Sequence, residues 1–209
     1  MKIPSMTEAL NLFDEGLKVL SANHPKFPSS IINTYRVHGT LVAFCAEIIA
    51  SKIPELDGRA AYILGLLHDY GKLITIEEKG DTFHGVSGYE AFLEKGYDDV
   101  ARICLSHSFP NKKFKIRDYA SYPVKELCKA TRLLRKIEYN DYDRLIQLCD
   151  MFVAGLGLVN LKDRMDFIRD KYRISSLIIK RKYREALELK RYFDKKCGCD
   201  IYMLLGVDR

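Results

Sequence analysis

The 209-residue sequence predicts an all-α protein folded as a compact helical bundle, and three observations lead to this prediction. Apolar residues recur at steps of three and four along most of the chain, which is the period of a helix with one buried face. Capping and turn residues divide this pattern into segments of helical length. The short β-type run at residues 73–76 has no comparable partner elsewhere, so we expect a loop there.

The expected helices are placed by their capping residues and their apolar spacing. Ser5 and Glu8 form a capping-box pattern before a helix whose buried stripe is Leu10, Phe13, Leu17 and Leu20. Ser29 or Ser30 caps the next helix, Asp57 the third, and Gly71 is expected to end that third helix. The remaining helices are expected at about residues 84–95, 98–107, 124–136, 141–153, 161–172 and 175–196, followed by a short turn at 200–205.

Composition and charge restrict the class of protein. The net charge of +6 and the pI of about 8.9 suit an anionic substrate, although they do not prove one. No apolar run approaches the ~20 residues that span a bilayer, and no signal-peptide pattern follows Met1. We therefore expect a cytoplasmic protein without a membrane partner, formed by one domain over residues 1–209 with a core at about 30–155 and the helices of 160–209 packed on it.

Four expected helices each carry one metal-ligand type of residue inside an apolar stripe. A single such histidine is usually a satisfied core residue, but a buried and unpaired aspartate would cost more free energy than folding can spare. Four cases on four helices predict that these side chains share a cation, because neutral imidazole and carboxylate are common ligands of divalent metals. The four residues are His38, His68, His107 and Asp150.

Two further residues extend this candidate set. Asp69 directly follows His68 at the end of its helix, where it could bind one ion or bridge two. His84 stands at the start of its expected helix, from which it could project over a cavity.

The order of these residues resembles a known family. His38, then His68-Asp69, then Asp150 on an all-helical chain is similar to the HD-domain superfamily of metal-dependent phosphohydrolases, and residues 68–72 resemble its H-D-x-G-K variant. The resemblance covers roughly residues 30–155. It implies that these four residues bind one divalent metal, and that His84 and His107 hold a second ion as in the binuclear members. The metals implied are Fe, Mn, Ni, Zn, Co or Mg.

The resemblance also implies a reaction: hydrolysis of a phosphate ester or anhydride of a nucleotide or other small phosphorylated molecule. Two ions about 3.5–4 Å apart supply an activated water and stabilise charge on the phosphoryl oxygens. Asp69 is the expected bridging ligand. Lys72 lies one turn beyond His68 and could contact a phosphate oxygen, or it could be a solvated lysine at a helix end.

The expected substrate contacts extend beyond Lys72. Arg36 is a weaker candidate, because it lies two residues from His38 and points off the stripe. Lys112 and Lys113 belong to a basic, aromatic loop after His107, which could form a rim that attracts phosphates and stacks a base, or could be a solvated loop.

The substrate stays open. The residues after His107, Ser108-Phe109-Pro110, differ from the motif found there in the cyclic-dinucleotide phosphodiesterase branch. The interval from His107 to Asp150 is longer than expected for the dinucleoside-tetraphosphate hydrolase branch.

Other functions also fit parts of the sequence. A non-catalytic HD-type module could bind a nucleotide or a protein partner, and a di-iron oxygenase could use the same His/Asp set. The basic stretch at 180–196 could touch nucleic acid, but it is better explained as the solvated face of an amphipathic helix that packs Leu177, Leu187 and Phe193. The intact ligand set favours the hydrolase.

Overall fold

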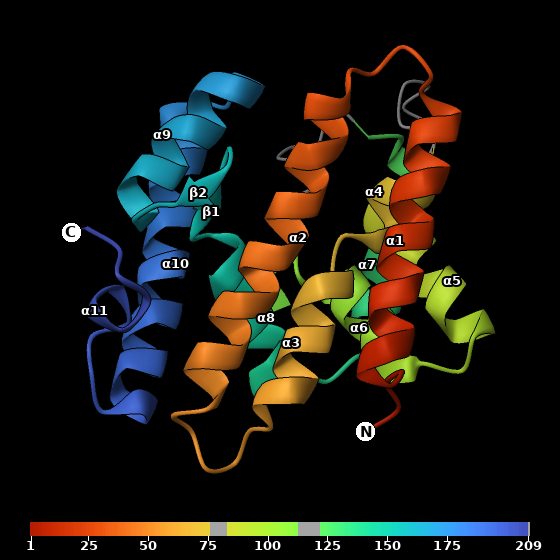
Figure 1. Cartoon of the computed structure of the whole chain (residues 1–209). Helices are drawn as coiled ribbons and strands as arrows, with labels where there is room; N and C mark the ends of the chain where they lie inside the picture. Colours follow the sequence, from red (N-terminus) through yellow and green to blue (C-terminus); the bar gives the residue numbers. More distant parts are fainter. Residues whose placement is uncertain (76–82, 113–121, 209) are drawn as a thin grey trace.

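The computed structural model describes residues 1–75, 83–112 and 122–208, and nearly all of its regular structure is helical (Figure 1). This confirms the all-α prediction. The helices are α1 (Met6–Asn23), α2 (Ser29–Ala50), α3 (Gly58–Leu67), α4 (Tyr70–Ile74), α5 (His84–Glu94), α6 (Asp98–Ser106), the 3-10 turn η2 (Pro110–Lys112), α7 (Val124–Leu134), α8 (Asp141–Asp150), α9 (Leu161–Tyr172), α10 (Ser176–Cys197) and α11 (Ile201–Leu205).

The helices form a layered bundle with α2, α3 and α8 at its centre. In Figure 1, α9 and α10 stand on one side of this centre, and α1, α4 and α5 stand on the other. The largest apolar cluster lies where these layers meet and includes Val42, Cys45, Leu64 and Leu148, all fully buried. A smaller cluster around Phe83 and Phe109 lies among the elements that follow residue 82. That the whole chain is one domain stays a prediction.

Local capping explains where several helices begin. The Ser5 hydroxyl accepts a hydrogen bond from the Glu8 N–H, and the Asp57 carboxylate accepts from the N–H groups of Arg59 and Ala60. Asn140 caps α8 through a reciprocal capping box. At α2 the expected serine cap is wrong: the N-cap is Pro28, without a side-chain hydrogen bond, because Ser29 already lies in the helix.

The stretch that follows His68 differs from the prediction in two ways. Leu73 and Ile74 lie in α4, not in a loop, and the Thr75 N–H donates to the Gly71 carbonyl. Gly71 does not end a helix, because α3 ends at Leu67 and Gly71 lies inside α4. A Cβ atom at Gly71 would lie 1.9 Å from the carbonyl oxygen of His84, so glycine is needed here for the close approach of α5.

The end of α8 was also predicted wrongly. The helix ends at Asp150, and a two-stranded antiparallel hairpin follows, with β1 (Val153–Ala154) paired to β2 (Gly157–Leu158). Gly155 has φ +59°, a left-handed conformation that suits a hairpin turn and that few other residues adopt.

Two leucines expected in apolar stripes are exposed: Leu10 is 43% exposed and Leu177 is 72% exposed. The buried face of α10 runs through Ile179, Ala186 and Phe193, and Leu177 is rotated by roughly 200° from Ile179 at 100° per residue.

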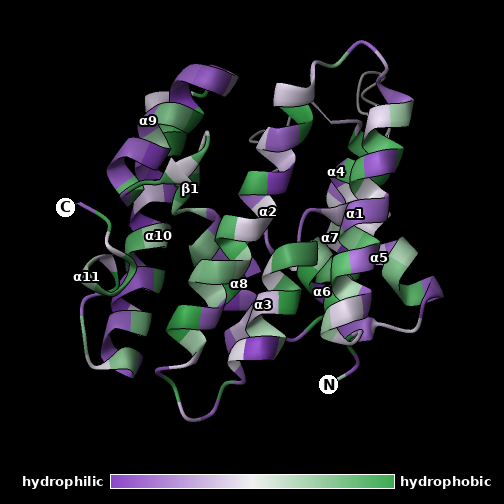
Figure 2. Ribbon diagram, viewed as in Figure 1, coloured by the Kyte–Doolittle hydropathy of each residue, from purple (hydrophilic) through white to green (hydrophobic). Residues whose placement is uncertain are grey.

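Hydropathy follows the layers. In Figure 2 the central helix α3 is largely hydrophobic, whereas α9 carries many hydrophilic residues. Over the described part of the chain, none of the helices has both the length and the apolar character that a membrane crossing requires.

Candidate metal centre

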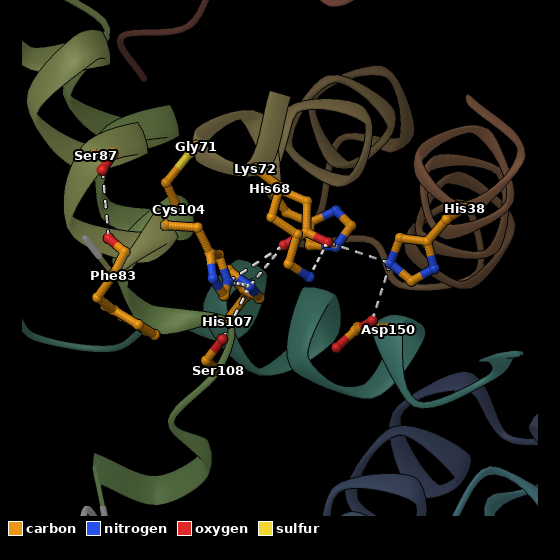
Figure 3. A network of polar contacts seen from close by, with 12 residues as sticks. His38, His68, Gly71, Lys72, Phe83, Ser87, Cys104, His107, Ser108 and Asp150 are labelled. Carbon is orange, nitrogen blue, oxygen red and sulfur yellow. Dashed lines mark hydrogen bonds and ion pairs between the residues drawn. The ribbon is translucent and has the colours of Figure 1, made fainter. Parts of the chain in front are cut away.

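The ends of several helices bring the predicted ligand-type side chains together. His38 projects from the middle of α2, while His68 and Asp69 occupy the junction between α3 and α4. His84 is the first residue of α5, and the remaining two, His107 and Asp150, stand at the ends of α6 and α8. Figure 3 shows the labelled members of this set pointing toward a common space.

Asp69 lies at the centre of the cluster. Its Oδ2 is 3.6 Å from His38 Nε2 and 3.5 Å from His68 Nε2, while its Oδ1 is 3.5 Å from His84 Nε2 and 3.1 Å from His107 Nε2. Asp69 therefore belongs to two groups of ligand-type atoms, one with His38 and His68 and one with His84 and His107. In each group these atoms lie within 4.8 Å of one another.

Backbone carbonyls orient two of the imidazoles. His68 Nδ1 is 2.6 Å from the Gly65 carbonyl oxygen, and His107 Nδ1 is 3.2 Å from the Ile103 carbonyl oxygen. A carbonyl only accepts hydrogen bonds, so each Nδ1 carries a proton, and in the neutral imidazole Nε2 then presents its lone pair toward Asp69. Lone pairs facing a carboxylate repel it unless a cation lies between them, and this arrangement is typical of metal-binding histidines.

The burial of these side chains strengthens the argument that a cation lies between them. His68 and His107 are 1% and 2% exposed, and burial lowers the pKa of His68 to about 3, so its imidazole is neutral. Within the described residues, His68 Nε2 and Asp69 Oδ1 are buried and form no hydrogen bond. Burial alone would raise the pKa of Asp69, but the Lys72 ammonium beside its Oδ2 holds it well below its usual range. A neutral imidazole beside an ionised carboxylate fits a divalent metal.

Asp150 stands beside the first group, not inside either one. Its Oδ1 is 3.2 Å from His38 Nε2 and 3.4 Å from Arg164 Nη2. Burial would raise the pKa of this carboxyl, but the hydrogen bond with His38 and the Arg164 guanidinium hold it well below its usual range. Asp150 is therefore an ionised carboxylate positioned next to His38.

Lys72 also lies at the centre, with its Nζ 2.6 Å from Asp69 Oδ2. Burial by itself would lower the pKa of Lys72, yet the carboxylates of Asp69 and Asp150 raise it above its ordinary value. Lys72 therefore keeps its positive charge and contributes it to the wall of the cavity described below.

The other expected phosphate contacts lie elsewhere. Arg36 is half exposed, pairs with Asp14 at 2.6 Å and does not line the cavity. Lys112 is exposed, donates to the Ile137 carbonyl and lies over the Tyr139 ring, also away from the cavity. Lys113 falls outside the described residues.

Four members of the cluster, His38, Asp69, His84 and Asp150, line the floor of a cavity of about 840 Å³. Its far wall comes from α9 and the start of α10, which no part of the sequence prediction had connected with the site. Tyr35 and Tyr122 also line it. The residues from α9, α10 and the junction between them are Arg164, Phe167, Ile168, Lys171, Tyr172, Arg173, Ile174, Ser175, Ile178 and Lys182. Arg164 and Lys171 are seven residues apart and share one helical face, a signal present in the sequence that would have grouped them.

A buried polar network supports the end of α6. Asp143 is fully buried and accepts hydrogen bonds from the Ser106 hydroxyl at 2.7 Å and the Asn140 N–H at 2.9 Å, and it pairs with Arg102 at 3.1 Å. Gln147 donates to the Ser106 carbonyl at 2.9 Å. These contacts tie α8 to the residue before His107, and sequence reasoning had not singled them out.

Comparison with known proteins agrees with this geometry. The HD domain family matches residues 36–155, which is more than half of the chain and contains every residue of the cluster. The chain belongs to the HD domain family. Membership of this family places the chain in the broad superfamily of metal-dependent phosphohydrolases, whose HD domains bind divalent metals. The chain matched no curated protein and no solved structure.

Proposed function

We propose that this protein is a hydrolase that cleaves a phosphate ester or anhydride of a nucleotide or another small phosphorylated molecule. The observation that carries the proposal is Asp69, whose two oxygens each face a pair of imidazoles at the floor of a cavity. A binding module would have no need for ligand atoms arranged in this way.

Two divalent ions fit this set of side chains. His38, His68 and Asp69 would hold one ion, with Asp150 beside them, and Asp69, His84 and His107 would hold the other. Bound there, the metals would supply Lewis-acid chemistry, which acidifies a water and offsets charge on phosphoryl oxygens.

The remaining chemistry belongs to the chain. In the hydrolysis, the water oxygen forms a new bond to phosphorus, the bond from phosphorus to the leaving oxygen breaks, and a proton from the water ends on that leaving oxygen. Lys72 remains an ammonium and lines the cavity beside Asp69, so it can donate to a phosphoryl oxygen. His68 and His107 are held in one orientation by the carbonyls that accept from their Nδ1 atoms.

The rest of the cavity suits a substrate with a flat apolar part. Tyr35, Phe167, Tyr172 and Tyr122 line it, and aromatic rings of this kind can stack a nucleobase. The volume of about 840 Å³ lies within the range of small-molecule sites, roughly 300–1,000 Å³. These features support a nucleotide as the substrate.

The test uses the full chain loaded with Mn²⁺ or Fe²⁺ and a panel of nucleotides and sugar phosphates, with released phosphate as the readout. We expect hydrolysis by the wild-type protein and background activity for Asp69→Ala. Asp170→Ala is the matched control, because Asp170 is an exposed carboxylate that does not line the cavity.

Full hydrolytic activity of Asp69→Ala would contradict the metal-dependent mechanism. Turnover that requires O₂ and leaves phosphate esters intact would instead identify the oxygenase alternative. Tight nucleotide binding without any turnover would identify the non-catalytic module.

A further inference from the structure

The described residues that line the cavity include five cationic side chains and two acidic ones. Among the described lining residues, the only acids are Asp69 and Asp150, and each of them already pairs with one cation of the wall, Lys72 or Arg164. Three further cations line the same cavity: Lys171, Arg173 and Lys182, here called the distal cations.

We propose that the distal cations bind a second anionic group of the substrate, so that the preferred substrate carries two or more phosphate groups. This inference rests on the proposed function, because it concerns the substrate of that same site. The distal cations lie outside residues 36–155, the part of the chain that the HD domain family matches.

The signs of charge are segregated on α9. The acidic residues of this helix do not line the cavity, and two of them, Asp166 and Asp170, pair with Arg169 outside it. Lys171 takes the opposite position: it lines the cavity, and its Nζ lies 5.4 Å from the Phe167 ring centroid and 5.3 Å from that of Tyr172. A solvated surface helix would mix both signs on each face, whereas one sign in a concave site concentrates anions there.

The junction between α9 and α10 adds to this positive region. Arg173 ends α9 in a left-handed conformation with φ 51°, and the next two residues, Ile174 and Ser175, also line the cavity. The first turn of α10 holds no acidic residue, and the Ser175 side chain makes no capping hydrogen bond. The positive end of the α10 dipole therefore reinforces the charge of the distal cations.

The inference is tested by the binding of inorganic tripolyphosphate and of orthophosphate to the full chain in the presence of a chelator, measured by titration calorimetry. This measurement needs neither bound metal nor hydrolysis. The variant is Lys171→Gln/Arg173→Gln/Lys182→Gln, in which the long side chains keep most of their apolar length. The matched control, Lys162→Gln/Lys180→Gln/Arg184→Gln, removes the same charge from the same two helices at exposed residues that do not line the cavity.

We expect the wild-type protein and the control to bind tripolyphosphate alike, and the distal variant to bind it about tenfold or more weakly, with little change for orthophosphate. Equal loss in both triple variants would show a general charge effect and overturn the inference, as would unchanged binding in both. Equal loss of orthophosphate and tripolyphosphate in the distal variant would also overturn it. Should the triple variant fail to fold by circular dichroism, the exposed single variant Arg173→Gln is compared with Arg184→Gln under the same criteria.

Hydrolysis is measured separately with the metal-loaded proteins, on a nucleoside monophosphate and a nucleoside triphosphate. If wild-type hydrolysis occurs but the distal variant keeps the wild-type ratio of kcat/KM for the two substrates, the inference fails and the proposed function stands. If no phosphorylated compound is hydrolysed by any protein, the proposed function fails, whatever the titrations show.

Discussion

At the scale of single residues, Asp69 connects the two halves of the candidate metal centre. It is the only residue shared by the two groups of ligand-type atoms found in the described residues. His38 and His84 each belong to one group alone. Because the groups share a single carboxylate, loss of that carboxylate affects both, whereas loss of one imidazole affects only its own group.

This difference between the shared carboxylate and the two histidines predicts how many metal ions each variant binds. We expect two ions per chain in the wild-type protein, about one in His38→Ala and in His84→Ala, and none in Asp69→Ala, measured by elemental analysis after gel filtration. His24→Ala is the matched control, because His24 stacks on Phe27 outside both groups and its loss leaves the metal content unchanged. An identical metal content in all four variants would contradict the assignment.

At the scale of elements, the centre depends on how closely α4 and α5 approach each other. His84 begins α5, and its carbonyl group packs against Gly71 of α4. An added Cβ at Gly71 would lie 1.9 Å from His84 O and 2.9 Å from Gly88 N, both of which are backbone atoms that cannot rotate away. The glycine of the H-D-x-G-K pattern therefore sets the position of His84, a ligand-type residue at the start of the next helix, α5.

We expect Gly71→Ala to lower the free energy of unfolding by about 1–3 kcal/mol, the usual cost of overpacking, and to weaken metal binding by the group that contains His84. Chemical denaturation measures the first effect and elemental analysis measures the second. Gly157→Ala is the matched control, since a Cβ at Gly157 meets no atom within 4 Å. Equal stability of the two variants would show that α5 can shift without cost.

The elements also show which predictions local sequence can support. Ser5, Asp57 and Asn140 act through hydrogen bonds to residues two or three positions away, so the starts of their helices follow from the sequence. The helix α4 and the hairpin at residues 153–158 depend on contacts with remote segments, and both were missed. Short elements carry too few residues for periodicity to identify them.

At the scale of the whole molecule, the ligand-type residues extend along most of the family-matched range, from α2 to α8. An ion bound by them would link helices that are distant in sequence and would bind the folded state only. Metal binding and global stability are therefore coupled.

A metal at one hundred times its Kd stabilises the folded state by about 2.7 kcal/mol. For a chain of this size, that corresponds to a rise in Tm of roughly 5–10 °C at about 2–4 °C per kcal/mol. We expect this rise on adding Mn²⁺ to chelator-treated wild-type protein, and its absence in Asp69→Ala, measured by scanning calorimetry. A wild-type Tm that does not respond to any divalent metal would contradict the metal centre.

The sequence by itself determined the helical class, most helix boundaries and the residues that form the cluster. The class and the boundaries follow from local periodicity and capping, and His38, His68, His107 and Asp150 follow from the free-energy cost of placing histidine and aspartate in apolar stripes. Asp69 and His84 were added because of their positions at the end of one expected helix and the start of another. Only the tertiary structure decided that each oxygen of Asp69 faces two imidazoles and that cations of α9 and α10 line the cavity. It also decided that α5 approaches α4 closely at Gly71, where no side chain fits. The physical reason is that periodicity reports which face of a helix is buried, whereas the partner of a charged or exposed side chain depends on how helices far apart in the chain pack together.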